Sequence, residues 1–355
     1  MKKKVKVFLQ ATVNYTNAQN LNCLALAKHL DKSKYDVRTC VGYSGNLPVE
    51  EILGVRYYKV RYPARIWLPI CWIFGILWSD IAYLPKAEYW RLCAWILRVF
   101  HKRAFQTVEG MFIGTNLEKG VALTGSKKKL RESLTYTGNA YSITECMKSV
   151  NERALGVKTN DKVLCLGAET IQFENNVCRE KLMDIAIIGG NLFYKGLDDF
   201  FQIALQFPQL KFHVIGSGMG KVNPENEVKR LGLKNVICHG MISHVELAEL
   251  LQSIQLHVFP SRAEGFPKVT LECAAAGVPS IVYDDYGADE WITTGQDGFV
   301  VKTLDDMESV IRDFVNHPER ISALSDNARK LAKCFDWSVV VKDWERVIDQ
   351  LGKGK

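Results

Sequence analysis

Two glutamates, Glu264 and Glu272, mark the most informative segment of the chain, with seven residues between them and a Gly-Phe-Pro turn just after the first. The apolar run Leu256–Pro260 predicts the end of a buried strand, and Thr270–Ala276 predicts the start of a helix. Ligands of open α/β sheets bind at such carboxyl ends of strands. Because a carboxylate accepts two hydroxyl hydrogen bonds, the pair is suited to hold two sugar-like rings. The alternative is an acidic helix start that only favours the helix dipole.

Lys195 is a candidate partner for negatively charged phosphates. It follows the expected strand Ile185–Ile188 in a loop that opens a helix, and Gly196 allows the backbone to come close. An ammonium group beside a helix N-terminus makes a good anion site. Taken alone, a lysine followed by a glycine is more often simply a solvated lysine.

The segments around these residues resemble the motifs of family 4 retaining glycosyltransferases, which are the group 1 type and have the GT-B fold. The similar blocks keep the order of that family and cover most of Val163–Leu351, whereas the resemblance is looser over Met1–Asn160. The blocks are Val163–Phe173, Ile187–Asp199, His213–Gly218, Glu264–Val282 and Tyr286–Val300. The resemblance implies two Rossmann-like domains that face a central cleft. It also implies retaining transfer of a sugar from a nucleotide-sugar donor, without a metal ion or other cofactor.

The resemblance assigns a role to individual residues. Lys195 would neutralise the leaving diphosphate, Glu264 would hold hydroxyls of the donor sugar, and Glu272 would hold the ribose. Further donor-binding positions would be Asn191, Gly196, Gly216, Ser217, His239, Arg262, Gly265, Phe266, Pro267, Lys268 and Val269. On the acceptor side the corresponding positions are Asn17, Ala18, Tyr83 and Lys86.

The donor side departs from the family pattern at one position. An arginine usually precedes the lysine–glycine pair, where this chain has Gly190 and Asn191, and Arg262 is the candidate substitute. A missing positive charge keeps two alternatives open. One is a non-catalytic GT-B protein that binds a nucleotide sugar, and the other is a different GT-B enzyme, such as a sugar-nucleotide epimerase or a phosphorylase.

Two further departures lie on the acceptor side. The family histidine that follows the strand Ile81–Leu84 is missing, which leaves Lys86 or Tyr83 to replace it. The early glycine pair of the family is Asn17-Ala18, in a polar loop that we expect to face the acceptor.

Strands and helices alternate along both halves of the chain, which is typical of α/β domains with parallel, doubly wound sheets. Expected strands are Val5–Leu9, Val37–Tyr43, Val55–Val60, Ile81–Leu84, Thr107–Phe112, Ile185–Ile188, Lys211–Ile215, Val236–His239, Leu256–Phe259 and Ser280–Tyr283. Expected helices are Leu21–Leu30, Ile66–Trp78, Ala87–Phe105, Leu197–Gln206, Val245–Ser253, Val269–Ala276, Met307–Asn316, Ile321–Cys334 and Trp337–Leu351. We expect an acceptor-binding, membrane-facing domain over 1–170 and a donor-binding domain over 171–336. By resemblance, a final helix in 337–355 crosses back to the first domain; the alternative is a terminal helix on the second.

Composition fits a soluble enzyme of two domains. The chain has 355 residues, which exceeds the length that a single hydrophobic core usually supports. Of these residues, 47% are hydrophobic, as is ordinary for a globular protein. Its ten cysteines form no Cys-x-x-Cys pair, which favours reduced core thiols of a cytosolic protein over disulfides or a zinc site. The segment Met1–Gln10 lacks the apolar region of a signal peptide, and no Asp-x-Asp stands where a metal ligand is needed.

Charge and aromatic residues suggest a membrane partner for the first half. Residues 1–160 carry 25 Lys and Arg against 11 Asp and Glu, whereas residues 161–355 carry 21 against 28. The run Ile66–Trp78 is uncharged, but it is shorter than a membrane span, which needs about 20 residues. The segment Ala87–Phe105 contains both tryptophan and arginine residues. This pattern suits helices on an anionic bilayer surface, and the alternative is two core helices. We therefore expect a cytoplasmic protein, peripheral on the inner face of the membrane. Its acceptor would be a lipid-linked or cell-surface glycan, as in lipopolysaccharide or capsule biosynthesis. No nucleic-acid recognition motif is present.

Overall fold

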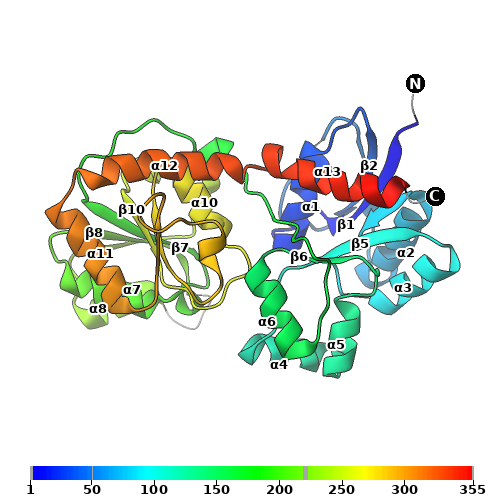
Figure 1. The fold of residues 1–355 in the computed structure, drawn as a ribbon, viewed down its shortest axis with the longest axis horizontal. Coiled ribbons are helices and arrows are strands. Elements are labelled where there is room, and N and C mark those ends of the chain that lie inside the picture. The colour runs from blue at the N-terminus through cyan, green and yellow to red at the C-terminus, as the bar shows by residue number, and fades with distance from the viewer. Residues whose placement is uncertain (1–2, 50, 219–222, 354–355) are drawn as a thin grey trace. The chain divides into compact units, whose positions relative to one another are not determined.

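A computed structural model describes residues 3–49, 51–218 and 223–353. The chain divides into two compact units. Unit 1 comprises Met1–Gly167 together with Trp337–Lys355, and unit 2 comprises Ala168–Asp336 (Figure 1). The division therefore lies three residues before the boundary expected at 170/171.

Unit 1 contains a six-stranded parallel sheet in the order β3-β2-β1-β4-β5-β6. The strands are β1 (Val5–Thr12), β2 (Tyr35–Gly42), β3 (Val55–Val60), β4 (Ile81–Tyr83), β5 (Arg103–Val108) and β6 (Ala140–Ser142). The helices are α1 (Ala18–His29), α2 (Ala64–Trp78), α3 (Trp90–Val99), α4 (Gly114–Thr124), α5 (Lys127–Ser133), α6 (Glu145–Leu155) and α13 (Trp337–Lys353).

Successive side chains of the central strands face opposite layers of helices. Phe8, Ala82 and Ala104 share one buried cluster with residues of α2 and α3. On the other face, the ring of Trp344 from α13 packs against Tyr83 and Phe105, with centroid distances of 5.1 and 6.0 Å. Figure 1 shows α13 running beside α1 in this unit. The last helix of the chain is thus part of the core of unit 1.

Unit 2 repeats this topology, with the strand order β12-β11-β10-β7-β8-β9. Its strands are β7 (Asp184–Gly190), β8 (Lys211–Ser217), β9 (Val236–Gly240), β10 (Leu256–Phe259), β11 (Ser280–Tyr283) and β12 (Phe299–Val301). Its α-helices are α7 (Leu197–Gln206), α8 (Pro224–Leu231), α9 (His244–Leu250), α10 (Lys268–Ala275), α11 (Leu304–Asn316) and α12 (Arg320–Cys334). The 3₁₀ turns are η1 (Ile171–Phe173), η2 (Leu192–Lys195) and η3 (Ala288–Glu290).

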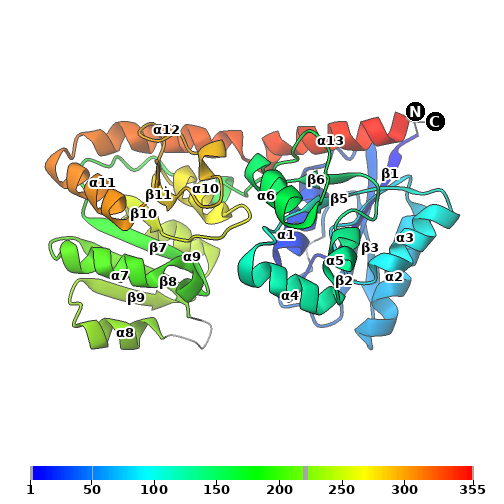
Figure 2. The same ribbon diagram turned by 60° about the horizontal axis from the view of Figure 1, so that its bottom comes forward.

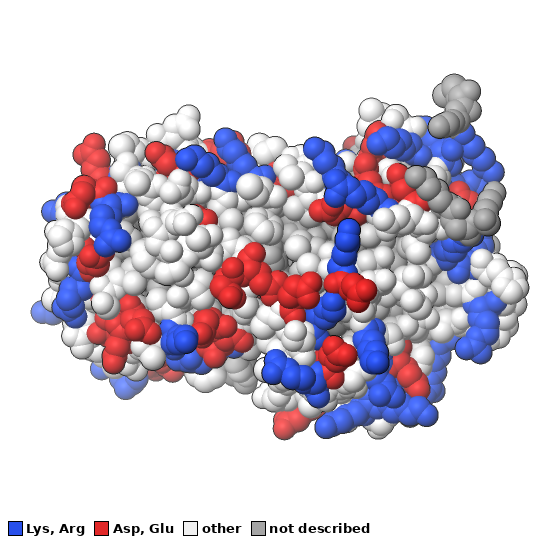
Figure 3. Space-filling model, viewed as in Figure 1, with Lys and Arg blue, Asp and Glu red and all other residues white. Residues whose placement is uncertain are grey.

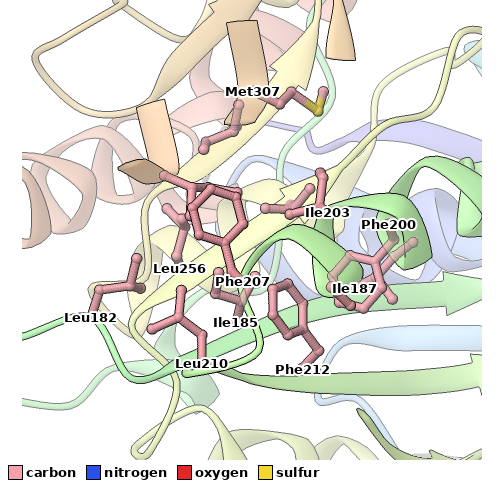
Figure 4. Close-up of a cluster of buried hydrophobic side chains, with 14 of the residues drawn as sticks. Leu182, Ile185, Ile187, Phe200, Ile203, Phe207, Leu210, Phe212, Leu256 and Met307 are labelled. Atoms are coloured by element: carbon pink, nitrogen blue, oxygen red, sulfur yellow. The ribbon is translucent and has the colours of Figure 1, made fainter. Parts of the chain in front are cut away.

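Two hydrophobic cores, one on each face of this sheet, hold unit 2 together. Ile185 and Ile187 of β7 point into the larger core with residues of α7 and α11 (Figure 4). Ala186 and Ile188 point into the second core with residues of α9 and α10. In Figure 2, α7 lies on the near side of the sheet and α9 on the far side. The helices that follow β7 and β10 therefore lie on opposite faces.

The alternation of elements is as predicted, and Val55–Val60, Leu256–Phe259, Ser280–Tyr283 and Leu197–Gln206 have the predicted bounds. The prediction of one helix over Ala87–Phe105, followed by a strand over Thr107–Phe112, is wrong. The helix ends at Val99, His101 adopts a left-handed backbone conformation with φ of 49°, and β5 begins at Arg103. Ala104 and Phe105 are buried strand residues, which the helical pattern around them concealed.

The predicted burial of the cysteines is also only partly right. All ten are free thiols, but Cys178 and Cys334 are exposed. The expected helix over Ile66–Trp78 forms as α2, which continues through Pro69 and Gly75.

Candidate functional site

The crevice expected at the carboxyl ends of the unit 2 strands lies between β7 and β10. These neighbouring strands lead into helices on opposite faces of the sheet, which is the arrangement that creates a ligand site in open α/β sheets. Lys195 follows β7 and Glu264 follows β10. Although 69 residues apart in sequence, they form an ion pair with 2.5 Å between Nζ and Oε1. The structure thus brings together the two predicted catalytic side chains.

This ion pair is partly shielded from water. The Lys195 and Glu264 side chains are 25% and 10% exposed, and the ammonium group lies 5.4 Å from the centroid of the Phe259 ring. Ser261 is fully buried, and its hydroxyl donates a 2.5 Å hydrogen bond to the same Glu264 oxygen. Two donors therefore hold one carboxylate oxygen, so the orientation of Glu264 is set before any ligand arrives.

Two glycines permit the close backbone approaches at this edge of the sheet. Gly196 has φ of 80°, and a Cβ atom there would lie 2.2 Å from the carbonyl oxygen of Pro260. Gly216, near the end of β8, has φ of 130°, and its Cβ atom would lie 1.8 Å from the carbonyl oxygen of Gly189. Only glycine satisfies both the conformation and the space at these positions.

The predicted loop from Gly265 to Val269 leads into the N-terminus of α10. Pro267 occupies the N-cap position, where no side chain caps the helix. An uncapped helix start offers backbone N–H groups and a positive dipole end to an anion. The Phe266 ring packs against Trp291 and Phe335, with centroid distances of 5.1 and 5.9 Å, so this side chain serves packing.

Glu272 lies in the second turn of α10 and is half-buried. Burial raises the pKa of its carboxyl group, while the charges of His244 and Lys268 oppose the rise. A half-buried carboxylate at this edge is suited to accept hydrogen bonds from ligand hydroxyls.

The candidate substitute for the missing arginine has other partners. Arg262 donates a 3.0 Å hydrogen bond to Asp285, and its guanidinium group lies 4.0 Å from the centroid of the Tyr283 ring. Asn191 has a left-handed backbone with φ of 57°, and its side-chain oxygen is buried without a hydrogen-bond partner among the described residues. The described partners of Arg262 are thus Asp285 and Tyr283, and Asn191 carries no charge.

His239, predicted beside the nucleotide base, is the penultimate residue of β9 and contacts a histidine of the neighbouring strand. Its Nε2 lies 2.9 Å from Nδ1 of His213, whose Nε2 lies 2.8 Å from Asp184. Burial, followed by the neighbouring His213, lowers the pKa of His239. Because Asp184 is the first residue of β7, this chain of contacts leads away from the carboxyl ends of the strands. Ser217, the last residue of β8, does lie at that edge.

The acceptor-side residues separate into two groups. Tyr83 is fully buried, and its hydroxyl lies 2.6 Å from that of Thr107, so its prediction as an acceptor contact is wrong. Asn17 and Lys86 meet, with 3.1 Å between Oδ1 and Nζ, and both line one pocket of unit 1. Ala18 is exposed at the start of α1 but does not line that pocket.

Sequence reasoning missed two residues of the unit 2 site. Ser261 directly precedes the Glu264 loop at the end of a buried strand, where a hydroxyl commonly bonds a residue a few positions on. Burial raises the pKa of Tyr286, and the nearby charge of Glu264 raises it further. Its buried hydroxyl has no hydrogen-bond partner among the described residues. Tyr286 could have been identified from the sequence, because it is the first residue of the block Tyr286–Val300 that resembles a family motif.

Within the described part of the chain, no group of three or more His, Cys, Asp or Glu side chains is arranged to hold a metal ion.

Residues 169–331 match the family model described as "Glycosyl transferases group 1". The match covers nearly all of unit 2, including every donor-side residue discussed above.

Curated relatives and solved structures agree with this match. An uncharacterized glycosyltransferase of Haemophilus influenzae is 21% identical over 224 residues, which are 61% of this chain and 62% of that protein. The N,N'-diacetylbacillosaminyl-diphospho-undecaprenol alpha-1,3-N-acetylgalactosaminyltransferase of Campylobacter jejuni is 26% identical over 183 residues, 51% of this chain and 48% of that protein. The chain thus spans about half to three fifths of these relatives. Anabaena HepE, solved in complex with UDP-glucose, superimposes with a TM-score of 0.74 at 14% identity, covering 98% of this chain and 100% of the other.

Together with the two six-stranded parallel sheets, the structural likeness confirms the predicted fold, GT-B with two Rossmann-like domains.

Proposed function

We propose that this chain, whose unit 2 carries the group 1 glycosyl transferase match, transfers a hexosyl group from a nucleotide-sugar donor to an acceptor, with retention of configuration. The observation that carries the proposal is the Lys195–Glu264 ion pair across the switch point between β7 and β10. A non-catalytic scaffold has no need for a shielded cation and carboxylate at that position.

The residues of unit 2 have complementary tasks in this reaction. Glu264, oriented by Ser261, binds hydroxyls of the donor sugar, and Glu272 binds those of the ribose. The Lys195 ammonium and the start of α10 stabilise the negative charge that grows on the diphosphate as it leaves. These groups supply the positive charge that a metal ion supplies in other phosphate-transfer sites, so the reaction is proposed to be metal-independent.

Retention is proposed to proceed by same-face displacement. The bond between the sugar C1 and the diphosphate oxygen breaks while the acceptor oxygen forms its bond to C1 on the same face. The acceptor proton passes to the departing phosphate oxygen, so no enzyme nucleophile is required. The anomeric configuration of the product, determined by NMR, tests this step, and full activity in EDTA tests metal independence.

Donor binding is expected to be specific for one nucleotide and to depend on Glu272. In a thermal-shift screen against UDP-, GDP-, ADP- and dTDP-sugars, one donor should raise the melting temperature of the wild type. The Glu272→Ala variant should bind that donor about 1–3 kcal/mol more weakly, the usual cost of lost hydrogen bonds to a charged group.

Glu308→Ala is the matched control, because Glu308 occupies the same position in α11 as Glu272 does in α10. Equal shifts in all three proteins would show that Glu272 does not bind the donor. No shift with any donor would favour the non-catalytic alternative. An isomerised donor or a sugar phosphate among the products would favour an epimerase or a phosphorylase.

The acceptor is proposed to be a lipid-linked or cell-surface glycan, reached by a protein that is peripheral on the cytoplasmic face of a membrane. No helix among the described residues combines the length and apolar character needed to cross a bilayer. The residues Trp95 and Phe100 are 58% and 49% exposed at one end of unit 1, beside the exposed Arg91 and Arg98. Figure 3 shows Lys and Arg gathered at the end of unit 1 that carries α2 and α3.

Replacing Trp95 and Phe100 together with serine is expected to weaken binding to anionic vesicles at least tenfold, since each ring contributes about 1.5–3 kcal/mol when fully buried. Co-sedimentation with phosphatidylglycerol vesicles at low salt measures the effect. Leu123→Ser, at an exposed leucine of α4, is the control. If the wild type did not bind these vesicles, the proposal of a membrane-associated protein would be abandoned.

A further inference from the structure

A second pocket of unit 1, of about 410 Å³, lies at the amino edge of its sheet. Its walls come from residues at or just before the start of β1, β4 and β5, three neighbouring strands of the parallel sheet, and from the end of α13. The predicted acceptor residues belong to the opposite, carboxyl edge, so this pocket is separate from them. The side chains that matter for its chemistry are those of Lys3, Lys4, Asp80, Phe100, Lys102 and Arg103.

Positive charges outnumber negative charges in this pocket. Among the described residues, one carboxylate, that of Asp80, lines it. One oxygen of this carboxylate already accepts a 2.9 Å hydrogen bond from a backbone N–H of β1. The cationic side chains that line the pocket are those of Lys3, Lys4, Lys102 and Arg103. A single carboxylate does not balance four cations.

Helix ends offset part of the excess. The Lys102 ammonium donates a 3.0 Å hydrogen bond to the carbonyl oxygen of Ser79, which is the C-cap residue of α2. Arg103 donates a 2.6 Å hydrogen bond to the carbonyl oxygen of Leu351 in α13, and α3 also ends at the pocket. A helix C-terminus carries about half a negative charge, so three of them leave, after Asp80, an excess of about one to two positive charges. That excess matches one singly charged phosphodiester.

Two lysines before β1 remain available to such a ligand. Lys3 and Lys4 are exposed, and the Lys4 ammonium donates a 2.6 Å hydrogen bond to the neutral carbonyl oxygen of Lys32. Because an ammonium group has three N–H donors, Lys4 keeps two of them for an anion. Hydrogen bonds from an ammonium group to a phosphate oxygen are charge-assisted and therefore strong.

An apolar rim adjoins these cations. Phe100 lines the pocket and is 49% exposed, and its ring meets that of Trp95 edge-on, with 6.5 Å between the centroids. Val99, the last residue of α3, is 47% exposed. A water-soluble phosphate has no use for such a rim, whereas a lipid carries its phosphate next to apolar chains.

We infer that this pocket binds the phosphodiester headgroup of an anionic phospholipid. Lys3 and Lys4 bind the phosphate oxygens, and Phe100 contacts the glycerol and the first carbons of the acyl chains. The inference rests on the membrane association proposed above, because a bilayer supplies the lipid. It does not depend on sugar transfer, so binding can be measured without any activity.

The test is isothermal titration with dihexanoylphosphatidylglycerol, a short-chain lipid kept below its critical micelle concentration. Lys3→Glu should weaken its binding at least tenfold, because the substitution changes the charge beside the phosphate by two units. Since Lys3 is exposed and precedes the first strand, this variant keeps the core of unit 1 intact. The double variant Lys4→Gln/Lys102→Gln should lose at least as much.

Lys128→Glu is the matched control, because Lys128 is an exposed residue of α5 outside the pocket and the charge change is the same. It should bind the lipid within twofold of the wild type. Two further probes separate the possible sources of the phosphate. Dihexanoylphosphatidylcholine, whose headgroup has no net charge, and sn-glycerol 3-phosphate, which has no acyl chains, should each bind to the wild type at least tenfold more weakly.

Four results would overturn the inference. They are wild-type affinity in Lys3→Glu, equal affinities for the two lipids, failure of the wild type to bind the short-chain lipid, and an sn-glycerol 3-phosphate affinity equal to that of the lipid, which would assign the pocket to a free phosphate.

The vesicle experiment keeps this inference distinct from the membrane proposal. If the wild type sedimented with phosphatidylglycerol vesicles and Lys3→Glu did so equally well, the pocket would be excluded while the membrane proposal stood. The donor screen is independent of both, because Lys3 and Lys128 lie in unit 1.

Discussion

Lys195→Ala should lower kcat at least a hundredfold while changing the affinity for the donor only a few-fold. The ammonium group offsets a charge that grows on the diphosphate as the sugar departs, so its contribution is largest in the transition state. Removing one such stabilising group typically costs about 10²–10³ in kcat. Release of the nucleoside diphosphate, followed with the donor identified in the thermal-shift screen, measures this effect.

Removing Lys195 also leaves the Glu264 carboxylate, 10% exposed, without its ion-pair partner. The double variant Lys195→Ala/Glu264→Gln relieves that charge and shows whether a loss of rate comes from chemistry or from a disturbed loop. Lys211→Ala, at an exposed lysine that begins β8, is the control and should retain full activity. An unchanged kcat in Lys195→Ala would remove this residue from the mechanism.

Gly216→Ala should lower the free energy of unfolding of unit 2 by about 2–5 kcal/mol. A residue other than glycine at φ of 130° is strained by about 1–3 kcal/mol, and overpacking costs about as much again. The added methyl group would lie 1.8 Å from the carbonyl oxygen of Gly189, so β7 and β8 have to separate where they carry the donor-side loops. Urea unfolding measures the loss of stability.

Gly190→Ala provides the comparison on the neighbouring strand. A Cβ atom at Gly190 meets no atom within 4 Å, and its φ is not in the left-handed region. This variant should therefore change the free energy of unfolding by less than about 1 kcal/mol, as for other unconstrained surface positions. Similar losses in the two variants would contradict the structural account of Gly216.

The topology could be predicted from the sequence because most strands are short apolar runs between clear helices. Leu197–Gln206 is an example of such a helix, since Gly196 directly precedes it and Pro208 follows it after one residue. The prediction missed the start of β5 because Ala104 and Phe105 extend the apolar pattern of α3. Only the backbone turn at His101 separates the two elements. The three-residue strands β6 and β12 are too short to show a period at all.

The candidate site was predicted in part for similar reasons. Lys195 and Glu264 could be assigned to one site by resemblance, but their ion pair depends on how β7 and β10 align, which no local pattern encodes. Tyr83 illustrates the opposite case. It ends a strand at the expected edge, yet strand alternation directs its ring towards Trp344, a residue more than 250 positions later in the sequence.

The position of α13 has a consequence for how the protein is made. Trp337 and Trp344 are fully buried in unit 1, and Trp344 donates a hydrogen bond to the carbonyl oxygen of Cys165. The face of Tyr83 and Phe105 therefore stays uncovered until α13 has been synthesised, which is after all of unit 2, although multidomain chains usually complete their first domain first. Unit 2, which is continuous in sequence, is complete before unit 1. During this interval the aromatic surface of the incomplete unit 1 is exposed to solvent. We therefore expect the nascent chain to be most prone to aggregation, and most dependent on chaperones, at this stage.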